Sequence, residues 1–346
     1  MKRIAILYQA AVPPPIHGVI KPLKPGGYRD SGADIGYALT NVDFPLVTPV
    51  PCPDAGDEET WVFPDTACGI DRALQKGAEV LWANTTVYQG HPLEQYMDHV
   101  AIIGQDPHLV DRYEDKWLMN SWLASQGFLV PRAIRVKAGQ DPALDDFADE
   151  VVVLKPVRGR GSQGVRKVQG QDQLHNEIRH WNLTLYGDAL LIESYLPGEE
   201  VTVTVMPPGT YQETHGNTIR DGHWVLPPVM RSGHVRGIVP YSGVVPVREN
   251  SRVLDRWPLE LDCFLRSCMD IGNQLNSRMV LRIDARADHL GQFRIVDVNF
   301  KPNLTGPGRP DRSRHTSLVT MAAEAMGWSY SQLVANLARQ YWRRSE

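Results

Sequence analysis

Residues 151–164 read VVVLKPVRGRGSQG, a β-branched run that delivers a lysine into a loop with three glycines. The run from Val151 to Leu154 predicts a buried strand that ends at Lys155. Glycines let backbone N–H groups approach phosphate oxygens without a clash at Cβ, and the lysine adds a point charge for the same anion. The sequence GxxxxGK[ST] is absent, so this is not a Walker loop. Taken alone, the stretch fits a phosphate-binding loop and a plain glycine-rich hairpin equally well.

A second group of polar residues surrounds a Pro-Gly turn further along the chain. Residues 191–201 read LIESYLPGEEV, which places Glu193 and Glu200 seven positions apart. A carboxylate can accept a hydrogen bond from an adenine amino group or a ribose hydroxyl. Two solvated surface acids are the alternative, and for this segment in isolation we favour it.

A third group combines two short segments, Arg282-Ile283-Asp284 and Asp297-Val298-Asn299. Within each predicted strand the two polar residues are i and i+2, so they share a face. If the strands pair, oxygen atoms of Asp284, Asp297 and Asn299 converge, and such hard donors suit Mg²⁺. Arg282 would then hold a phosphate or carboxylate on the same face.

The alternative interpretation of the third group is an outward polar face. Phe293 and Ile295 stand at the same parity as Asp297 and Asn299. We therefore expect that face to be more than a simple solvated surface.

These pieces, in this order, resemble the ATP-grasp superfamily, and within it the D-alanine–D-alanine ligase family. The similarity covers residues 115–346. Its markers are Asp115-Lys116, Lys155-Pro156 with the loop 161–164, the segment 193–200, Arg282-Ile283-Asp284, and Asp297-Val298-Asn299. Each marker alone is unspecific, but five in sequence at suitable spacing are a strong signal.

The resemblance implies roles for the matching positions. The implied ATP-binding residues are Lys116, Lys155, Gly161, Ser162, Gly164, Glu193, Tyr195, Leu196 and Glu200. The implied ligands of two Mg²⁺ ions, for which Mn²⁺ can substitute, are Asp284, Asp297 and Asn299. The catalytic candidates are Arg282, Lys155, Ser162 and Arg236, and the substrate-binding candidates are Asn303, Ser317 and Tyr241.

The chain also departs from the family pattern. Asp297 stands where these ligases usually have Glu, which keeps the donor type on a shorter side chain. The turn that begins at Phe300 is longer by several residues before Ser317. No Gly-Gly-x-Ser-x-Glu substrate loop follows the first strand, and residues 207–250 contain no obvious match to the lysine of the family's mobile loop. We therefore expect substrates other than those of a housekeeping D-alanine ligase.

The predicted fold class is α/β (α+β), an ATP-grasp fold with a Rossmann-like N-terminal domain. The predicted domains are 1–108, 109–196 and 197–346, the first being the pre-ATP-grasp domain. Expected strands are 4–8, 79–83, 151–155, 190–193, 200–206, 279–284 and 293–299; expected helices are 32–39, 111–126, 254–275, 316–326 and 329–341. Residues 207–250 show little periodicity, and 207–245 are the candidate lid.

Composition excludes several classes of protein. The net charge of −4 disfavours nucleic acid as the main partner. No apolar stretch approaches the roughly 18 residues that a membrane helix needs. The four cysteines form no CxxC pair, which favours reduced thiols and a cytoplasmic protein over a zinc site or disulfides.

The expected activity, by resemblance, is an ADP-forming ligase that joins a carboxylate to an amine through an acyl phosphate. Its partners would be a small-molecule acid and amine, both amino-acid-like, and the resemblance allows a homodimer. A small-molecule kinase on the same fold and a non-catalytic nucleotide-binding module are the alternatives. The presence of all three metal-ligand candidates and of both Lys116 and Lys155 argues against a non-catalytic binding module.

Overall fold

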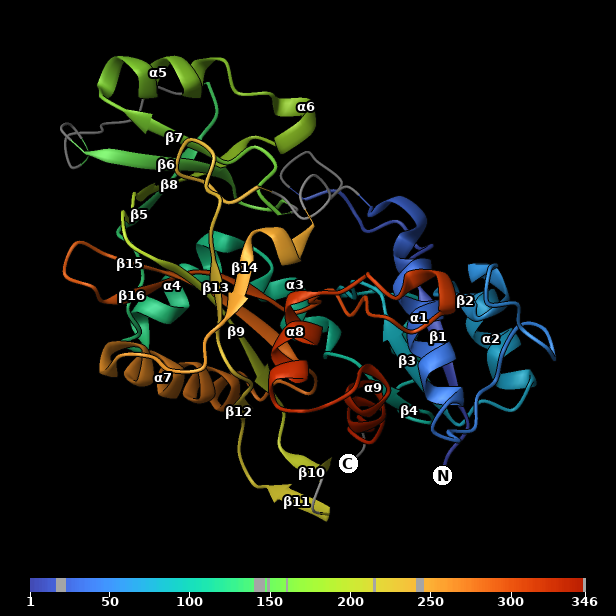
Figure 1. Cartoon of the computed structure of the whole chain (residues 1–346). Coiled ribbons are helices and arrows are strands. Elements are labelled where there is room, and N and C mark those ends of the chain that lie inside the picture. The colour runs from blue at the N-terminus through green and yellow to red at the C-terminus, as the bar shows by residue number, and fades with distance from the viewer. Residues whose placement is uncertain are drawn as a thin grey trace.

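The computed structural model describes residues 1–16, 23–139, 147, 150–159, 161–213, 216–240 and 246–344. Its strands form three main sheets and a two-stranded hairpin, arranged as Figure 1 shows. One sheet is parallel and the others are antiparallel, which confirms the mixed α/β class. Within the described ranges, no helix is both long and apolar enough to cross a membrane.

The parallel N-terminal sheet is built from the first hundred residues, and its order is β2–β1–β3–β4. Ile4 and Ile6 pack on the α1 side of the sheet, while Ala5 and Leu7 pack on the α2 side, as the alternation of a strand requires. The bounds are β1 Ile4–Tyr8, β2 Val62–Pro64, β3 Val80–Asn84, β4 Ala101–Ile103, α1 Arg29–Thr40 and α2 Ala67–Gln75. The expected strands 4–8 and 79–83 and the helix 32–39 are thus confirmed to within a few residues.

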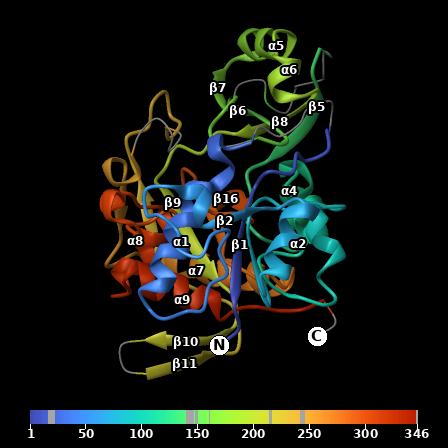
Figure 2. The same ribbon diagram turned by 90° about the vertical axis from the view of Figure 1, so that its right-hand side faces the viewer.

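The central sheet has the order β5–β8–β6–β7, and α5 and α6 pack on it (Figures 1 and 2). Val152, Leu154, Leu190 and Ile192 form the core beneath these helices. The bounds are β5 Ala133–Lys137, β6 Val151–Pro156, β7 Arg166–Gln169, β8 Ala189–Ser194, α5 Gln171–Arg179 and α6 Leu183–Tyr186. The expected strands at 151–155 and 190–193 are confirmed.

The C-terminal sheet has the order β14–β13–β9–β15–β16, with β12 beside β9. Helix α7 packs on it, and the β10–β11 hairpin projects from the body of the molecule (Figures 1 and 2). The bounds are β9 Glu200–Met206, β10 Gly209–Glu213, β11 Gly216–Arg220, β12 Trp224–Val225, β13 Val229–Arg231, β14 Ser251–Val253, β15 Leu281–Ala287, β16 Phe293–Asn299 and α7 Leu259–Leu275. Helices α8 Leu318–Ala325 and α9 Tyr330–Ala338 end the fold.

Three expectations about elements need correction. The expected helix 111–126 is two helices, α3 Pro107–Tyr113 and α4 Lys116–Ser125, because Asp106 and Asp115 each cap a separate start. Helix α7 begins after Pro258 rather than at 254, since proline suits a helix start. The third correction concerns residues 207–250, for which the sequence predicted no strand. This stretch contains β10 to β13, which are too short and too exposed to show a clear alternation of apolar and polar residues.

The division into three domains at 108 and 196 stays a proposal. The sheet boundaries are compatible with it, since the first sheet ends at 103, the second at 194 and the third begins at 200. The C-terminal tail returns to the first sheet, where Trp342 pairs with Ile102 of β4.

Candidate active site

The main cavity has a volume of 330 Å³ and lies between the three sheets. Most of the residues predicted for the site line it. These are Lys116, Lys155, Gly161, Ser162, Glu193, Tyr195, Leu196, Glu200, Arg282, Asp284, Asp297, Asn299, Asn303 and Ser317. The fold therefore brings residues from distant parts of the sequence into one space.

Three predicted site residues are not placed at the cavity. Gly164, at a φ of +74°, packs against the ring of Tyr186. Arg236 is exposed and has the left-handed φ of +50°, next to Gly237, which does line the cavity. Tyr241 lies outside the described residues.

Lys116 is positioned by the start of α4. The Asp115 carboxylate accepts hydrogen bonds from the N–H groups of Trp117 and Leu118, both at 3.0 Å, and so caps the helix. Lys116 then forms an ion pair with Asp297. Burial alone would raise the pKa of Asp297, but Lys116, Lys155 and Arg282 outweigh it and lower that pKa. The carboxylate is therefore held ionised, as a metal ligand must be.

Lys155 occupies the end of β6, where the sequence predicted it. Its Nζ lies 2.7 Å from Oε2 of Glu193 on the neighbouring β8, and it donates to the carbonyl oxygen of Val296 at 2.9 Å. The side chains of Lys155 and Glu193 are 7% and 5% exposed. Burial raises the pKa of Glu193, and the two nearby lysines offset only part of that effect. This pairing keeps the charged groups of Lys155 and Glu193 in fixed positions, in which an incoming polar ligand can contact them.

A β-bulge at Val296 decides which way β16 points its side chains. Asp284 pairs with Asp297, whereas Ala285 pairs with Ile295, so Val296 is an extra residue. Phe293 and Ile295 consequently belong to the core, while Asp297 and Asn299 line the cavity. The expectation that these four residues share a face is wrong, because it assumed an unbroken strand.

Arg282 and Asp284 lie on the same face of β15. Arg282 donates from Nη2 to Oδ2 of Asp284 at 2.8 Å, and Thr202 donates to Oδ1 at the same distance. Burial would lower the pKa of Arg282, but Asp284 and Asp297 reverse the shift and raise it. The arginine therefore stays cationic in the lining of the cavity.

The oxygen donors of this face fit Mg²⁺ better than a softer metal. Asp284 and Asp297 stand opposite one another on paired strands, and Asn299 follows two residues later. No cluster of three His, Cys, Asp or Glu occurs in the part of the chain that the structure describes. Two carboxylates and one amide make an incomplete shell, which suits a cation that also takes phosphate and water oxygens.

Two contacts hold the segment that follows β13, one from the loop after β6 and one from the start of β9. Ser162 donates to the carbonyl oxygen of Val239 at 2.8 Å, and His234 lies 3.0 Å from the carboxylate of Glu200. Gly237 to Pro240 line the cavity. Among the described residues of the expected lid 207–245, Arg231 also lines the cavity, and the assignment of this segment as a lid stays a proposal.

Comparison with known proteins agrees with this geometry. A family model described as an ATP-grasp domain matches residues 113–213. The D-alanine–D-alanine ligase of Gluconobacter oxydans is 30% identical over 231 residues, which cover 65% of this chain and 67% of that protein. The chain belongs to the D-alanine–D-alanine ligase-like family of ATP-grasp proteins. Another such ligase, from Gloeobacter violaceus, is 28% identical over 191 residues.

Solved structures extend the similarity in fold to the whole of this ATP-grasp chain. A D-alanine–D-alanine ligase from Bacillus anthracis, in complex with ATP, has a TM-score of 0.67 at 17% identity, with 98% and 97% of the two chains covered. In sequence, the chain spans about half the length of several curated relatives, 54% in the Gloeobacter case.

Sequence reasoning missed two arginines of this ATP-grasp site. Arg286 donates to Gly198, Gly237 and the hydroxyl of Tyr195 at 3.0, 2.6 and 3.0 Å. Its position, two residues after Asp284 on the same strand face, could have revealed it. Arg231 lines the cavity, and burial lowers its pKa. Its Nε has no hydrogen-bond partner within the described ranges, and no periodicity in 207–250 pointed to it.

Sequence reasoning also missed the part of the cavity that faces the N-terminal sheet. We call it the tyrosine end; it comprises Lys24, Tyr28, Thr86 and Lys301. Lys24 and Tyr28 precede α1, Thr86 follows β3, and Lys301 lies in the turn after β16.

Proposed function

We propose that the protein is an ATP- and Mg²⁺-dependent ligase that joins a carboxylate to an amine through an acyl phosphate and releases ADP and phosphate. The observation that carries the proposal is the convergence of three cations with the three oxygen donors in one cavity. The cations are Lys116, Lys155 and Arg282. Phosphoryl transfer needs this combination because negative charge moves onto the leaving and the transferring groups.

In the proposed first step, an oxygen of the substrate carboxylate attacks the γ-phosphorus of ATP, and the bond to ADP breaks. Lys116 and Lys155 bind the phosphates, and bound Mg²⁺ supplies further charge neutralisation. Glu193, Tyr195 and Leu196 would hold adenine and Glu200 the ribose, a proposal supported by the presence of all four residues in the cavity lining.

In the second step, the amine attacks the acyl carbon, the C–O bond to phosphate breaks, and the amine loses a proton. We assign to Arg282 the binding of the oxygens of the transferring phosphoryl group and of the tetrahedral intermediate, which its position at the cavity supports. The acyl phosphate must be kept from water, and we assign that task to Gly237 to Pro240, to which Ser162 is tied.

The decisive test is a screen for products by mass spectrometry. Pooled carboxylates and pooled amines, amino acids among them, are incubated with the protein and Mg-ATP in the cytoplasmic pH range. We expect ligated products, with phosphate released only when acid and amine are both present. A stable phosphorylated acid would favour a kinase, and no consumption of ATP across the panel would contradict both enzymatic functions.

A further inference from the structure

Arg231 lines the cavity and forms no ion pair with a carboxylate of the described residues. In this it differs from Lys116, Lys155 and Arg282, each of which has an acidic partner at the cavity. The Nε atom of Arg231 is buried, and no hydrogen-bond partner for it occurs in the part of the chain that the structure describes. Buried charged donors without an acceptor cost free energy. An arginine of this kind in a cavity therefore indicates a ligand that completes its contacts.

Arg231 is held on one side by the neighbouring strand. Its own strand, β13, lies between β14 and β9 (Figure 1). Nη2 of Arg231 donates to Oδ1 of Asn250 at 3.4 Å, a long hydrogen bond, and Ser251 donates to the same oxygen at 3.1 Å. Asn250 is 2% exposed, so its position is fixed by packing. This contact orients the guanidinium group and leaves most of its N–H donors for another acceptor.

The carboxylates on the same side of the sheet are engaged by other partners. Glu200 stands opposite Arg231 in the register of β9 and β13, but its Oε2 lies 3.0 Å from Nε2 of His234. Asp284 accepts hydrogen bonds from Arg282 and Thr202, both at 2.8 Å. The negative charges of Glu200 and Asp284 therefore act on Arg231 only at longer range.

The electrostatic balance of Arg231 shows the consequence. Burial lowers the pKa of Arg231, the charges of Asp284 and Glu200 offset only part of that effect, and Arg282 adds to it. For Arg282, by contrast, the carboxylates outweigh burial and the pKa is raised. The positive charge of Arg231 is thus incompletely compensated, and an anion in the cavity would stabilise it.

We propose that Arg231 binds the phosphate chain of Mg-ATP together with Lys116 and Lys155. This role rests on the proposed function, in which Glu200 holds the ribose and Asp284 binds the metal ion. The phosphate chain connects these two positions of the bound nucleotide, and Arg231 is subject to the charges of both residues. A planar guanidinium group can donate to two phosphate oxygens at once, whereas a lysine acts as a point charge. A neutral ligand at this place would leave the charge of Arg231 uncompensated.

Nucleotide binding tests this role without any turnover. Adenylyl imidodiphosphate, a non-hydrolysable ATP analogue, is titrated with Mg²⁺ by calorimetry into wild-type protein and into Arg231→Met, which keeps the aliphatic packing. We expect the Kd of the analogue to rise about tenfold or more in the variant, because charge-assisted hydrogen bonds are lost. The Kd of adenosine, measured by competition with the analogue, should not change, since adenosine lacks the phosphates.

Two further variants separate binding from structural support. Arg231→Lys keeps a cation and should recover part of the affinity for the analogue, which a role in packing alone does not predict. Arg252→Met is the matched control, because Arg252 is exposed on the neighbouring strand β14 and does not line the cavity. Its affinity for the analogue should equal that of the wild type. Thermal unfolding checks that each variant is folded.

The outcomes distinguish the role of Arg231 from the ligase function. Wild-type affinity of folded Arg231→Met for the analogue overturns the role, as does an equal loss of affinity for adenosine. If the analogue binds normally while the KM of the acid or the amine rises, Arg231 binds a substrate carboxylate and not the phosphate chain. If the expected loss is found but the product screen gives no ligated product, the ligase function fails and the role of Arg231 in nucleotide binding stands.

Discussion

At the scale of single residues, the cavity holds its acids and bases as pairs. Lys116 faces Asp297, Lys155 faces Glu193, and Arg282 faces Asp284. Each pairing holds its two side chains in a fixed orientation at the cavity. An incoming substrate phosphate can replace the carboxylate partner of one of these cations, and an incoming metal ion can replace the cationic partner of one of these carboxylates. Substitution of one member affects both the chemistry and its remaining partner.

Asp297→Ala is expected to lower ATP-dependent turnover by about 10²-fold or more, since a lost metal ligand costs several kcal/mol at the transition state. The measurement is phosphate release at saturating ATP and Mg²⁺, with circular dichroism to verify folding. Asp262→Ala is the matched control, because this exposed aspartate also pairs with an arginine, Arg266. Wild-type turnover by folded Asp297→Ala protein would refute the metal assignment.

Glu200→Ala is expected to raise the KM for ATP about tenfold, more than the KM for the amine, because a hydrogen bond to a carboxylate is lost. Steady-state kinetics with each substrate varied in turn give the two values. Glu199→Ala serves as control, since Glu199 is exposed and does not line the cavity. An unchanged KM for ATP would argue against contact of Glu200 with the ribose.

At the scale of elements, the start of a helix and one β-bulge determine the direction in which functional side chains point. The strands that carry Lys155, Glu193 and Glu200 were predictable, because β-branched runs bounded by turn residues mark them. The break between α3 and α4 was not, because several aspartates in this stretch could serve as caps. The bulge at Val296 was not predictable either, since it depends on the register with β15. Most residues of the family markers do line the cavity, whereas the tyrosine end depends on packing between distant segments.

Asp115→Ala is expected to lower the free energy of unfolding by about 1–2 kcal/mol, because the first N–H groups of α4 lose their acceptor. Urea unfolding followed by circular dichroism measures the change. Asp115→Asn, which keeps a capping oxygen, should cost less than half as much. Equal losses in the two variants would show that the charge of Asp115, not its capping bond, matters to α4.

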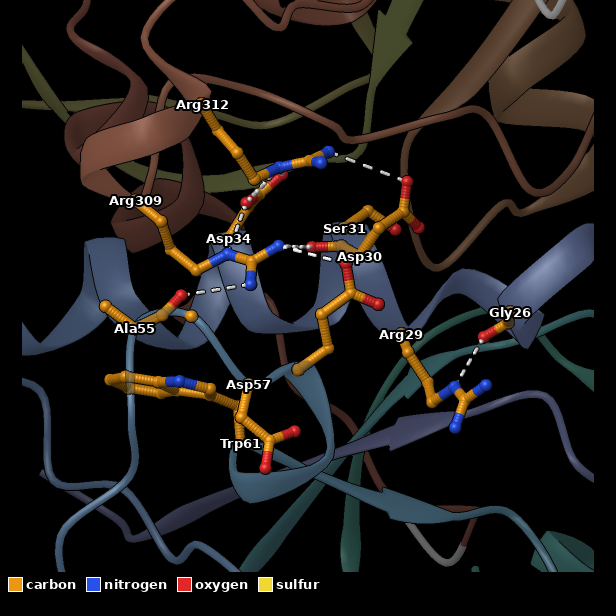
Figure 3. Close-up of polar contacts among 12 residues, drawn as sticks. Gly26, Arg29, Asp30, Ser31, Asp34, Ala55, Asp57, Trp61, Arg309 and Arg312 are labelled. Atoms are coloured by element: carbon orange, nitrogen blue, oxygen red, sulfur yellow. Dashed lines mark hydrogen bonds and ion pairs between the residues drawn. The ribbon is translucent and has the colours of Figure 1, made fainter.

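At the scale of the whole molecule, the turn after β16 joins the C-terminal sheet to α1 of the N-terminal sheet. Arg309 contacts Asp34, Glu58 and the carbonyl oxygen of Ala55 at 2.9, 3.2 and 3.1 Å (Figure 3). Burial raises the pKa of Asp34, although Arg312 and Arg309 oppose the shift. The two arginines therefore favour the ionised form of the Asp34 carboxyl group, which burial disfavours. Two sides of the cavity are fixed relative to each other by this contact.

Arg309→Leu is expected to lower the free energy of unfolding by about 3–5 kcal/mol, because it deprives the buried Asp34 carboxylate of one of its two arginine partners. The double variant Arg309→Leu/Asp34→Leu should recover part of that loss. Urea unfolding of the four proteins of this cycle gives the coupling energy. Strictly additive losses would contradict a direct interaction between the two side chains.

Asp30→Asn provides a test by pH. Burial would raise the pKa of Asp30, but Lys24 and Arg312 outweigh it and lower that pKa. The stabilisation is thus fully present above the unfolded pKa of about 3.9 and is lost as the pH falls through the lower folded value. Unfolding free energies should differ by about 1–2 kcal/mol between wild type and variant at pH 7. We expect that difference to shrink below about pH 4; growth on acidification would contradict the sign.

The contact of Gly308 with α1 restricts which segments can be exchanged between this protein and a relative. A Cβ at position 308 would collide with the backbone oxygen of Asp34, so the turn and the helix touch at main-chain distance. The turn carries Lys301 and the helix carries Asp30, so neither segment can be transplanted alone into a relative. A chimera that swaps residues 300–316 must import α1 as well. We therefore expect the two segments to be exchanged together between relatives, although Asp34 and Arg309 lie 275 positions apart in the sequence.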